Sequence, residues 1–72
     1  MTQNEFLKEF QDILQRDEPV DLDGKLADME EWDSLTAMAT SFFLKSKFKI
    51  DLPLENFKEF QTARDIWNLI QN

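Results

Sequence analysis

Several residue types on which proteins build chemistry are missing from this chain of 72 residues. It has no cysteine and no histidine, one glycine and two prolines. Without cysteine there is neither a disulfide nor a thiolate metal site. Without histidine the chain lacks the side chain that most often acts as a base near neutral pH and as a metal ligand. Because a Ser-His or Cys-His pair cannot be built, catalysis is disfavoured, and we expect that the chain is not an enzyme and binds no metal. The length of 72 residues predicts a single domain over residues 1–72.

Positive charge is scarce as well. Eight Lys and Arg residues stand against fifteen Asp and Glu residues, which gives a net charge of −7. Nucleic acids require a basic footprint, and an anionic membrane surface would repel such a chain. We therefore expect no nucleic acid or membrane partner, but enzymes with basic docking patches. Since no apolar run has the length of a transmembrane helix and no signal-peptide pattern opens the chain, we expect a cytoplasmic monomer.

The spacing of the apolar residues predicts an all-α fold, because no segment alternates apolar and polar residues as a strand does. The capping-box sequence Thr2-Gln3-Asn4-Glu5 opens a first helix that is expected to end near Gln15 or Arg16. One face of this helix is apolar, formed by Phe6, Leu7, Phe10, Ile13 and Leu14. A long acid-rich loop follows over residues 17–33. Its apolar anchors are expected to be Val20, Leu22, Leu26 and Met29.

The second half of the chain predicts three more helices. Asp33 is a good N-cap for a helix running to about Phe48. Its apolar contacts are expected from Leu35, Met38, Phe42, Leu44 and Phe48. Residues 50–53 should be extended, because a residue before proline avoids the helical region. A short helix over residues 54–60 and a last helix capped by residues 62–65 complete a four-helix bundle with a long first loop and a short third helix.

The stretch Glu31-Trp32-Asp33-Ser34-Leu35 joins the acidic loop to the second helix. It places Ser34 in the first helical turn, where unpaired N–H groups and the helix dipole stabilise an anionic oxygen. A phosphodiester on Ser34 would lie in that field. Nothing nearby in the sequence can activate the hydroxyl, so a modifying enzyme would have to bring the base and any metal. Taken alone, Asp-Ser at a helix start is also ordinary capping chemistry.

The wider pattern resembles an acyl carrier protein, in the broad sense that includes peptidyl and other specialised carriers. The resemblance extends over nearly all 72 residues. It follows the capped first helix, the acidic loop, an Asp-Ser-Leu motif, an aromatic residue, an extended segment with proline and a threonine-capped last helix. The residues that carry it are Leu26, Met29, Trp32-Asp33-Ser34-Leu35, Phe48, Leu52-Pro53, Phe60, Thr62-Ala63, Ile66 and Ile70.

The resemblance implies that Ser34 carries 4′-phosphopantetheine, transferred from coenzyme A by a phosphopantetheinyl transferase. The thiol of that group would hold an acyl or aminoacyl intermediate as a thioester for loading and processing enzymes. Asp33 and Leu35, which flank the serine in the family motif, would help the transferase to recognise it.

Two features depart from the familiar carriers of fatty acid biosynthesis. Their second helix is usually acidic, whereas here it carries Lys45 and Lys47, with Lys49 just beyond. Many carriers also have a glycine where this chain has Glu30-Glu31-Trp32. These departures suggest a dedicated pathway, such as secondary metabolite biosynthesis, with its own enzymes. We expect partners to dock on Glu30, Glu31, Trp32, Met38, Lys45 and Lys47. A solvated helix end explains the lysines equally well, since cations there favour the dipole.

Three alternatives stay open. The chain could be an unmodified acidic interaction domain with Ser34 as a helix-start residue only. Residues 19–30 also resemble a degenerate calcium loop, with Asp21, Asp23 and Glu30 at ligand positions three, five and twelve but Pro19 at the first. The third alternative is that aromatic side chains line a space for the cargo, whereas we expect them to pack in the core. These residues are Phe42, Phe43, Phe57, Phe60 and Trp67.

Overall fold

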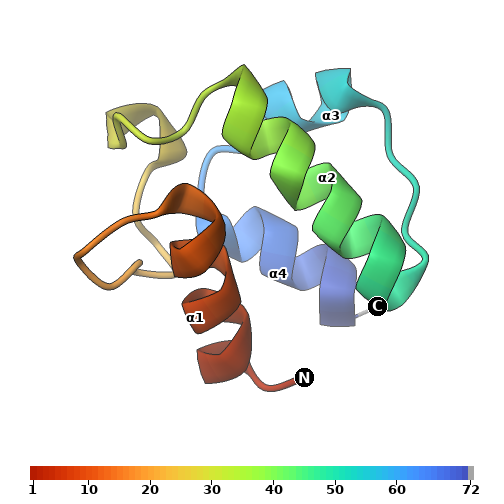
Figure 1. Ribbon diagram of the computed structural model, residues 1–72, viewed down its shortest axis with the longest axis horizontal. Helices are drawn as coiled ribbons and strands as arrows, with labels where there is room; N and C mark the ends of the chain where they lie inside the picture. Colours follow the sequence, from red (N-terminus) through yellow and green to blue (C-terminus); the bar gives the residue numbers. More distant parts are fainter. Residues whose placement is uncertain (72) are drawn as a thin grey trace.

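The computed structural model describes residues 1–71 and contains four α-helices (Figure 1). They are α1 (Gln3–Leu14), α2 (Ser34–Phe48), α3 (Leu54–Glu59) and α4 (Ala63–Gln71), with a single 3₁₀ turn, η1 (Leu26–Asp28), between α1 and α2. Within residues 1–71 there is no strand, so the all-α prediction is confirmed. Among these residues no helix combines the length and the apolar character needed to cross a bilayer.

Both predicted caps of the first two helices are present. At α1, the Glu5 amide donates to Thr2 Oγ1 and the Thr2 amide donates to Glu5 Oε1, at 3.2 and 2.8 Å. The last helical residue of α1 is Leu14, and the C-cap Gln15 that follows it has a left-handed φ of 54°. At α2, Asp33 is the N-cap, and the last helical residue is Phe48. Local side chains satisfy the starts of both helices, and the backbone amides of the left-handed C-caps Gln15 and Lys49 satisfy their ends. The two helices therefore begin and end close to where the sequence predicts.

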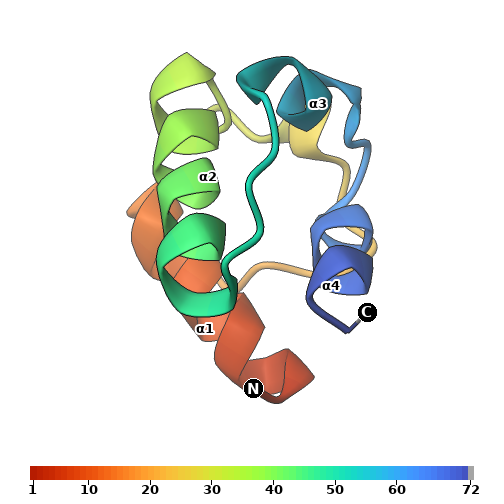
Figure 2. The same ribbon diagram turned by 90° about the vertical axis from the view of Figure 1, so that its right-hand side faces the viewer.

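The core is built around stacked aromatic rings from the two ends of the chain. Phe6 lies between Phe10 and Trp67, with ring centroids 5.7 and 5.5 Å apart. Helix α2 packs against α1 and against α3, and Figure 2 shows the extended segment after α2 running back toward α3. All four loop anchors that the sequence indicated are buried: Val20, Leu22, Leu26 and Met29.

The apolar face predicted for α2 is wrong in part. Leu35, Met38 and Phe42 are 74, 55 and 72% exposed, whereas Phe43 is buried instead. Helix α2 has apolar side chains on all sides, so spacing alone could not select the buried one. The structure buries a face with small residues, including Thr40, whose hydroxyl donates to the Thr36 carbonyl at 2.8 Å. The other core aromatics, Phe57 and Trp67, are buried, and Phe60 is half-buried.

The acid-rich loop is tied to the start of α4. The Leu26 amide donates to the Gln61 carbonyl and the Arg64 amide to the Leu22 carbonyl, both at 2.9 Å. Arg64 also forms a two-pronged ion pair with Asp23, at 2.7 and 3.1 Å. This pair occupies a carboxylate that the calcium alternative needs as a ligand. Among residues 1–71 no group of three or more acidic side chains is arranged to hold a metal ion.

Candidate functional site

Ser34 is the first residue of α2 and its side chain is exposed. The Asp33 carboxylate accepts from the amides of Leu35 and Thr36, both at 3.0 Å. The Thr36 hydroxyl accepts from the Asp33 amide at 2.9 Å and lies 2.8 Å from the Glu31 carbonyl, to which it donates. These contacts fix the backbone on both sides of Ser34. Its own amide is the first of the helix and has no intrahelical acceptor.

The same contacts hold Asp33 in its ionised form. The Thr36 amide is the main cause that keeps the pKa of the Asp33 carboxyl below its ordinary value of 3.8, with further support from the Thr36 hydroxyl and the Leu35 amide. A carboxylate held in this way is a poor proton acceptor. Asp33 therefore shapes the helix start and does not serve as the base that would activate Ser34.

Because the Asp33 pKa is lower in the folded chain, Asp33 stabilises the fold above about pH 3.8 and loses that contribution as the pH falls through the folded pKa. Asn caps a helix as well as Asp does and does not titrate. We therefore expect Asp33→Asn to keep the Tm near neutral pH but to lose less stability on acidification. Circular dichroism melts between about pH 6 and about pH 3 measure this. Parallel loss of Tm in both proteins would contradict the capping role.

A hollow of about 250 Å³ opens beside Ser34 between α2 and α3. It is lined by Trp32, Asp33, Ser34, Ala37, Leu54, Phe57 and Lys58. Most of these side chains are apolar, and one is a cation. The start of α2 therefore places the exposed Ser34 hydroxyl at a partly apolar recess in which Asp33 and Lys58 carry opposite charges. Sequence reasoning did not identify Leu54 or Lys58, because only the packing of α3 on α2 brings them to Ser34.

The start of α2 also borders α1. A second hollow, of about 300 Å³, is lined there by residues of both helices. They are Ile13, Leu14, Gln15, Asp33, Leu35, Thr36 and Ala39. Leu35 thus stands beside Ser34 with its side chain largely exposed, in a position where an approaching protein can contact both residues.

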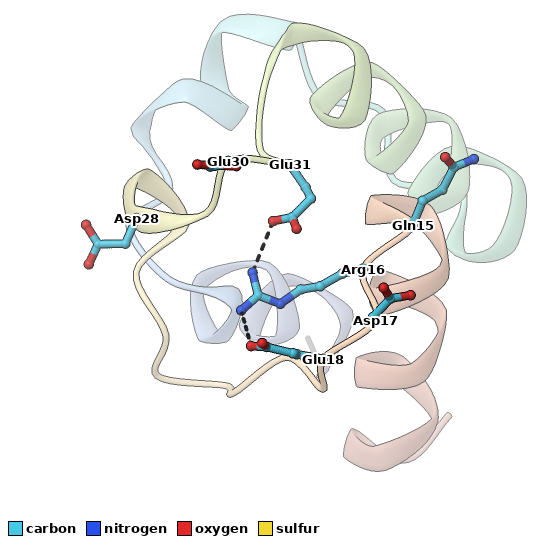
Figure 3. Close-up of a pocket in the computed structure, with 7 residues that line it drawn as sticks. All are labelled: Gln15, Arg16, Asp17, Glu18, Asp28, Glu30 and Glu31. Carbon is cyan, nitrogen blue, oxygen red and sulfur yellow. Dashed lines mark hydrogen bonds and ion pairs between the residues drawn. The ribbon is translucent and has the colours of Figure 1, made fainter.

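The end of α1 is joined to the segment before Ser34 by Arg16 (Figure 3). Its guanidinium lies 3.1 Å from Glu31 Oε1 and 3.5 Å from Glu18 Oε2, in an acidic hollow of about 430 Å³. Asp28 lines the same hollow, but its carboxylate points away from Arg16. The side chains of Arg16 and Glu31 are 22 and 34% exposed. The Arg16–Glu31 pair therefore links Glu31 to the end of α1. Because the Thr36 hydroxyl donates to the Glu31 carbonyl, the same pair connects α1 to the first turn of α2.

Loss of the Arg16–Glu31 ion pair should lower the free energy of unfolding more than loss of the exposed Arg16–Glu18 pair. Arg16→Met keeps the apolar stem but leaves Glu31 partly buried without its cation, so we expect a loss of about 1 kcal/mol, between the values for exposed and buried pairs. Glu18→Gln, at the exposed end of the other pair, should leave stability unchanged. Urea unfolding of both variants measures the difference. Equal values would show that the Arg16–Glu31 contact contributes nothing.

The residues predicted to meet partners lie on two sides of Ser34. On the loop side, Glu30 is exposed, Glu31 is engaged by Arg16, and Trp32 is half-buried with its ring 5.8 Å from that of Phe10. On the α2 side, Met38, Lys45 and Lys47 are exposed. Trp32 thus serves the core as well as the edge of the site.

Comparison with known proteins gives the family. A family model described as a phosphopantetheine attachment site matches residues 4–70. The chain therefore belongs to this family of carrier domains, whose members bear a 4′-phosphopantetheine group, as the resemblance to acyl carrier proteins predicted. Searches among curated proteins and solved structures gave no significant match.

Proposed function

We propose that this chain is a carrier protein that bears 4′-phosphopantetheine on Ser34 and holds an acyl or aminoacyl intermediate as a thioester on that arm. The observation that supports Ser34 most directly is its place as the exposed first residue of α2, capped by Asp33 and beside a recess between α2 and α3. The match to the family model spans nearly the whole chain and includes this residue.

The attachment requires chemistry that the chain does not supply. In the step we propose, Ser34 Oγ attacks the phosphorus of coenzyme A that bears pantetheine, and the bond to the bridging pyrophosphate oxygen breaks. Adenosine 3′,5′-bisphosphate leaves, and the hydroxyl proton passes to a base. Asp33 is a poor base because its carboxylate is held by backbone amides. We therefore propose that the transferase brings the base and any metal ion, and that the carrier itself catalyses nothing.

The surroundings of Ser34 suit the attached group. The free amide at the start of α2 favours a phosphate, and Lys58 in the same hollow would offset its negative charge. The apolar lining contributed by Leu54 and Trp32, which are both half-buried, fits the less polar part of an arm or its cargo. These residues would hold and orient the group, while the group itself supplies the thiol that bonds the cargo.

We propose that partner enzymes bind to the surfaces on the two sides of Ser34. Glu30, Glu31 and Trp32 would meet a basic surface on the transferase, together with Asp33 and Leu35 from the motif. Met38, Lys45 and Lys47 would meet enzymes that load or process the cargo. The proposal places the protein in the cytoplasm as a monomer, in a fatty acid or secondary metabolite pathway.

The test of the carried thioester uses protein purified from its own cells. Intact mass spectrometry should give the chain plus one phosphopantetheine group, and a further mass that neutral hydroxylamine removes, because hydroxylamine cleaves thioesters. A peptide map should place the group on Ser34. A chain that is always unmodified in its own cells would favour the alternative, an acidic helical interaction domain in which Ser34 only begins a helix.

A further inference from the structure

The outward side of α2 carries an apolar ridge formed by Leu35, Met38 and Phe42. These residues follow one another at spacings of three and four, so they lie on one face of the helix, about 10 Å long. All three are more than half exposed, and within residues 1–71 they are, with Met1, the exposed large apolar side chains. Side chains of this size in a row mark a contact surface more often than isolated ones do.

The charge along this helix differs from that of the rest of the chain. Between Ser34 and Ile50 there is no carboxylate, although the chain has fifteen, and three of its eight basic residues are here, at Lys45, Lys47 and Lys49. All three are exposed. Lys45 continues the row of the α2 ridge, three residues after Phe42. The ridge therefore runs from Ser34 at one end to a cluster of cations at the other.

We infer that the α2 ridge docks on a cargo-handling enzyme through an apolar recess whose rim is acidic at the end that meets Lys45, Lys47 and Lys49. The acidic loop would attract a basic enzyme surface, but the three lysines at this end of α2 would repel it. Since the ridge begins at Ser34, an enzyme seated on it reaches whatever Ser34 carries. The inference rests on the proposed function and adds the chemical character of one class of partner.

Two other occupants fit the surface less well. A second copy seated on the ridge would cover Ser34, and three side chains are far short of the roughly 800 Å² that a stable interface buries on each partner. An anionic membrane would attract the three lysines, but it would repel the segments before and after α2, which carry all fifteen carboxylates of the chain. A transient contact with an enzyme whose recess has an acidic rim needs little buried area, and it leaves Ser34 accessible to that enzyme.

The first step of the test identifies the partner. The chain is produced with the photoreactive residue p-benzoylphenylalanine in place of Phe42, modified at Ser34 by a transferase, and irradiated in a lysate of its source cells. Captured proteins are then purified, and their dissociation constants for the wild-type carrier are measured by calorimetry at low and at high salt.

The second step tests the charge with matched variants. Lys45→Glu with Lys47→Glu should weaken binding of the captured enzyme about tenfold or more, and Phe42→Ser should weaken it comparably. Lys8→Glu with Lys25→Glu makes the same change in net charge at exposed lysines outside α2, and should have little effect. Replacing acidic rim residues of the enzyme by lysine should restore its binding to the α2 double variant.

Several results would overturn the inference. They are capture of a second copy of the chain, capture of nothing, a partner that binds the α2 double variant as well as the wild type or better, and Phe42-dependent binding to phosphatidylglycerol vesicles. Failure of the proposed function is recognised separately, because the mass of the chain after the transferase reaction reports it before any partner is added. Apo protein then takes the place of the modified chain in the same measurements.

Discussion

Ser34→Ala is expected to abolish attachment of phosphopantetheine while leaving the fold intact. The Ser34 side chain is exposed and makes no hydrogen bond among the contacts described for residues 1–71. The cap of α2 comes from Asp33 and Thr36 instead, so truncating the hydroxyl removes the nucleophile and little else. Intact mass after a transferase reaction should show no gain for the variant, and its Tm should lie within a few degrees of the wild type.

Ser46→Ala is the matched control for this variant. Ser46 is also an exposed serine of α2, but it lies near the end of the helix, away from Ser34. The control should be modified like the wild type. If Ser34→Ala lost much of its helicity, the loss of modification would follow from unfolding, and the place assigned to Ser34 at the helix start would be wrong.

Phe6→Ala is expected to remove a large part of the stability of the fold, whereas the same substitution at Phe42 is expected to change little. Phe6 is fully buried between Phe10 and Trp67, and emptying such a site costs about 3–5 kcal/mol. At roughly 0.05–0.15 kcal/mol per residue, a domain of this size has only about 4–11 kcal/mol of stability. Phe42 is 72% exposed, and its truncation should stay within about 0.5 kcal/mol.

Thermal and urea unfolding followed by circular dichroism measure both variants. The pair is informative because the chemical change is identical and only the burial differs. A large loss of stability for Phe42→Ala would mean that this side chain packs against the domain in solution. Phe42 would then not belong to the α2 ridge.

The parts of the fold that sequence could predict were those governed by local chemistry. The buried anchors of the loop were predicted from their apolar character, and the capping box at Thr2 and the N-cap at Asp33 from their neighbours in the chain. The start and end of α2 were predicted for the same reason. Ser34 at a helix start followed directly from its neighbour Asp33.

What sequence could not predict depended on contacts between distant elements. The apolar side chains of α2 do not gather on one face, so their spacing did not reveal that Phe43 is buried and Phe42 exposed. The bonding of Arg16 to Glu31 requires the loop to return to the end of α1. Lys58 reaches the hollow at Ser34 only because α3 packs on α2. In each case the packing of two elements determines which residues meet, and the spacing of residues along the chain does not predict it.

The most direct test of the central claim is to locate the modified residue after a transferase reaction. The chain is incubated with coenzyme A, magnesium and a broad-specificity phosphopantetheinyl transferase, and its intact mass and peptide map are measured. We predict a gain of one phosphopantetheine group, found on Ser34 and not on Ser41 or Ser46. A folded chain that gains no mass with several transferases, or that gains it on another residue, would contradict the assignment of Ser34 as the attachment site.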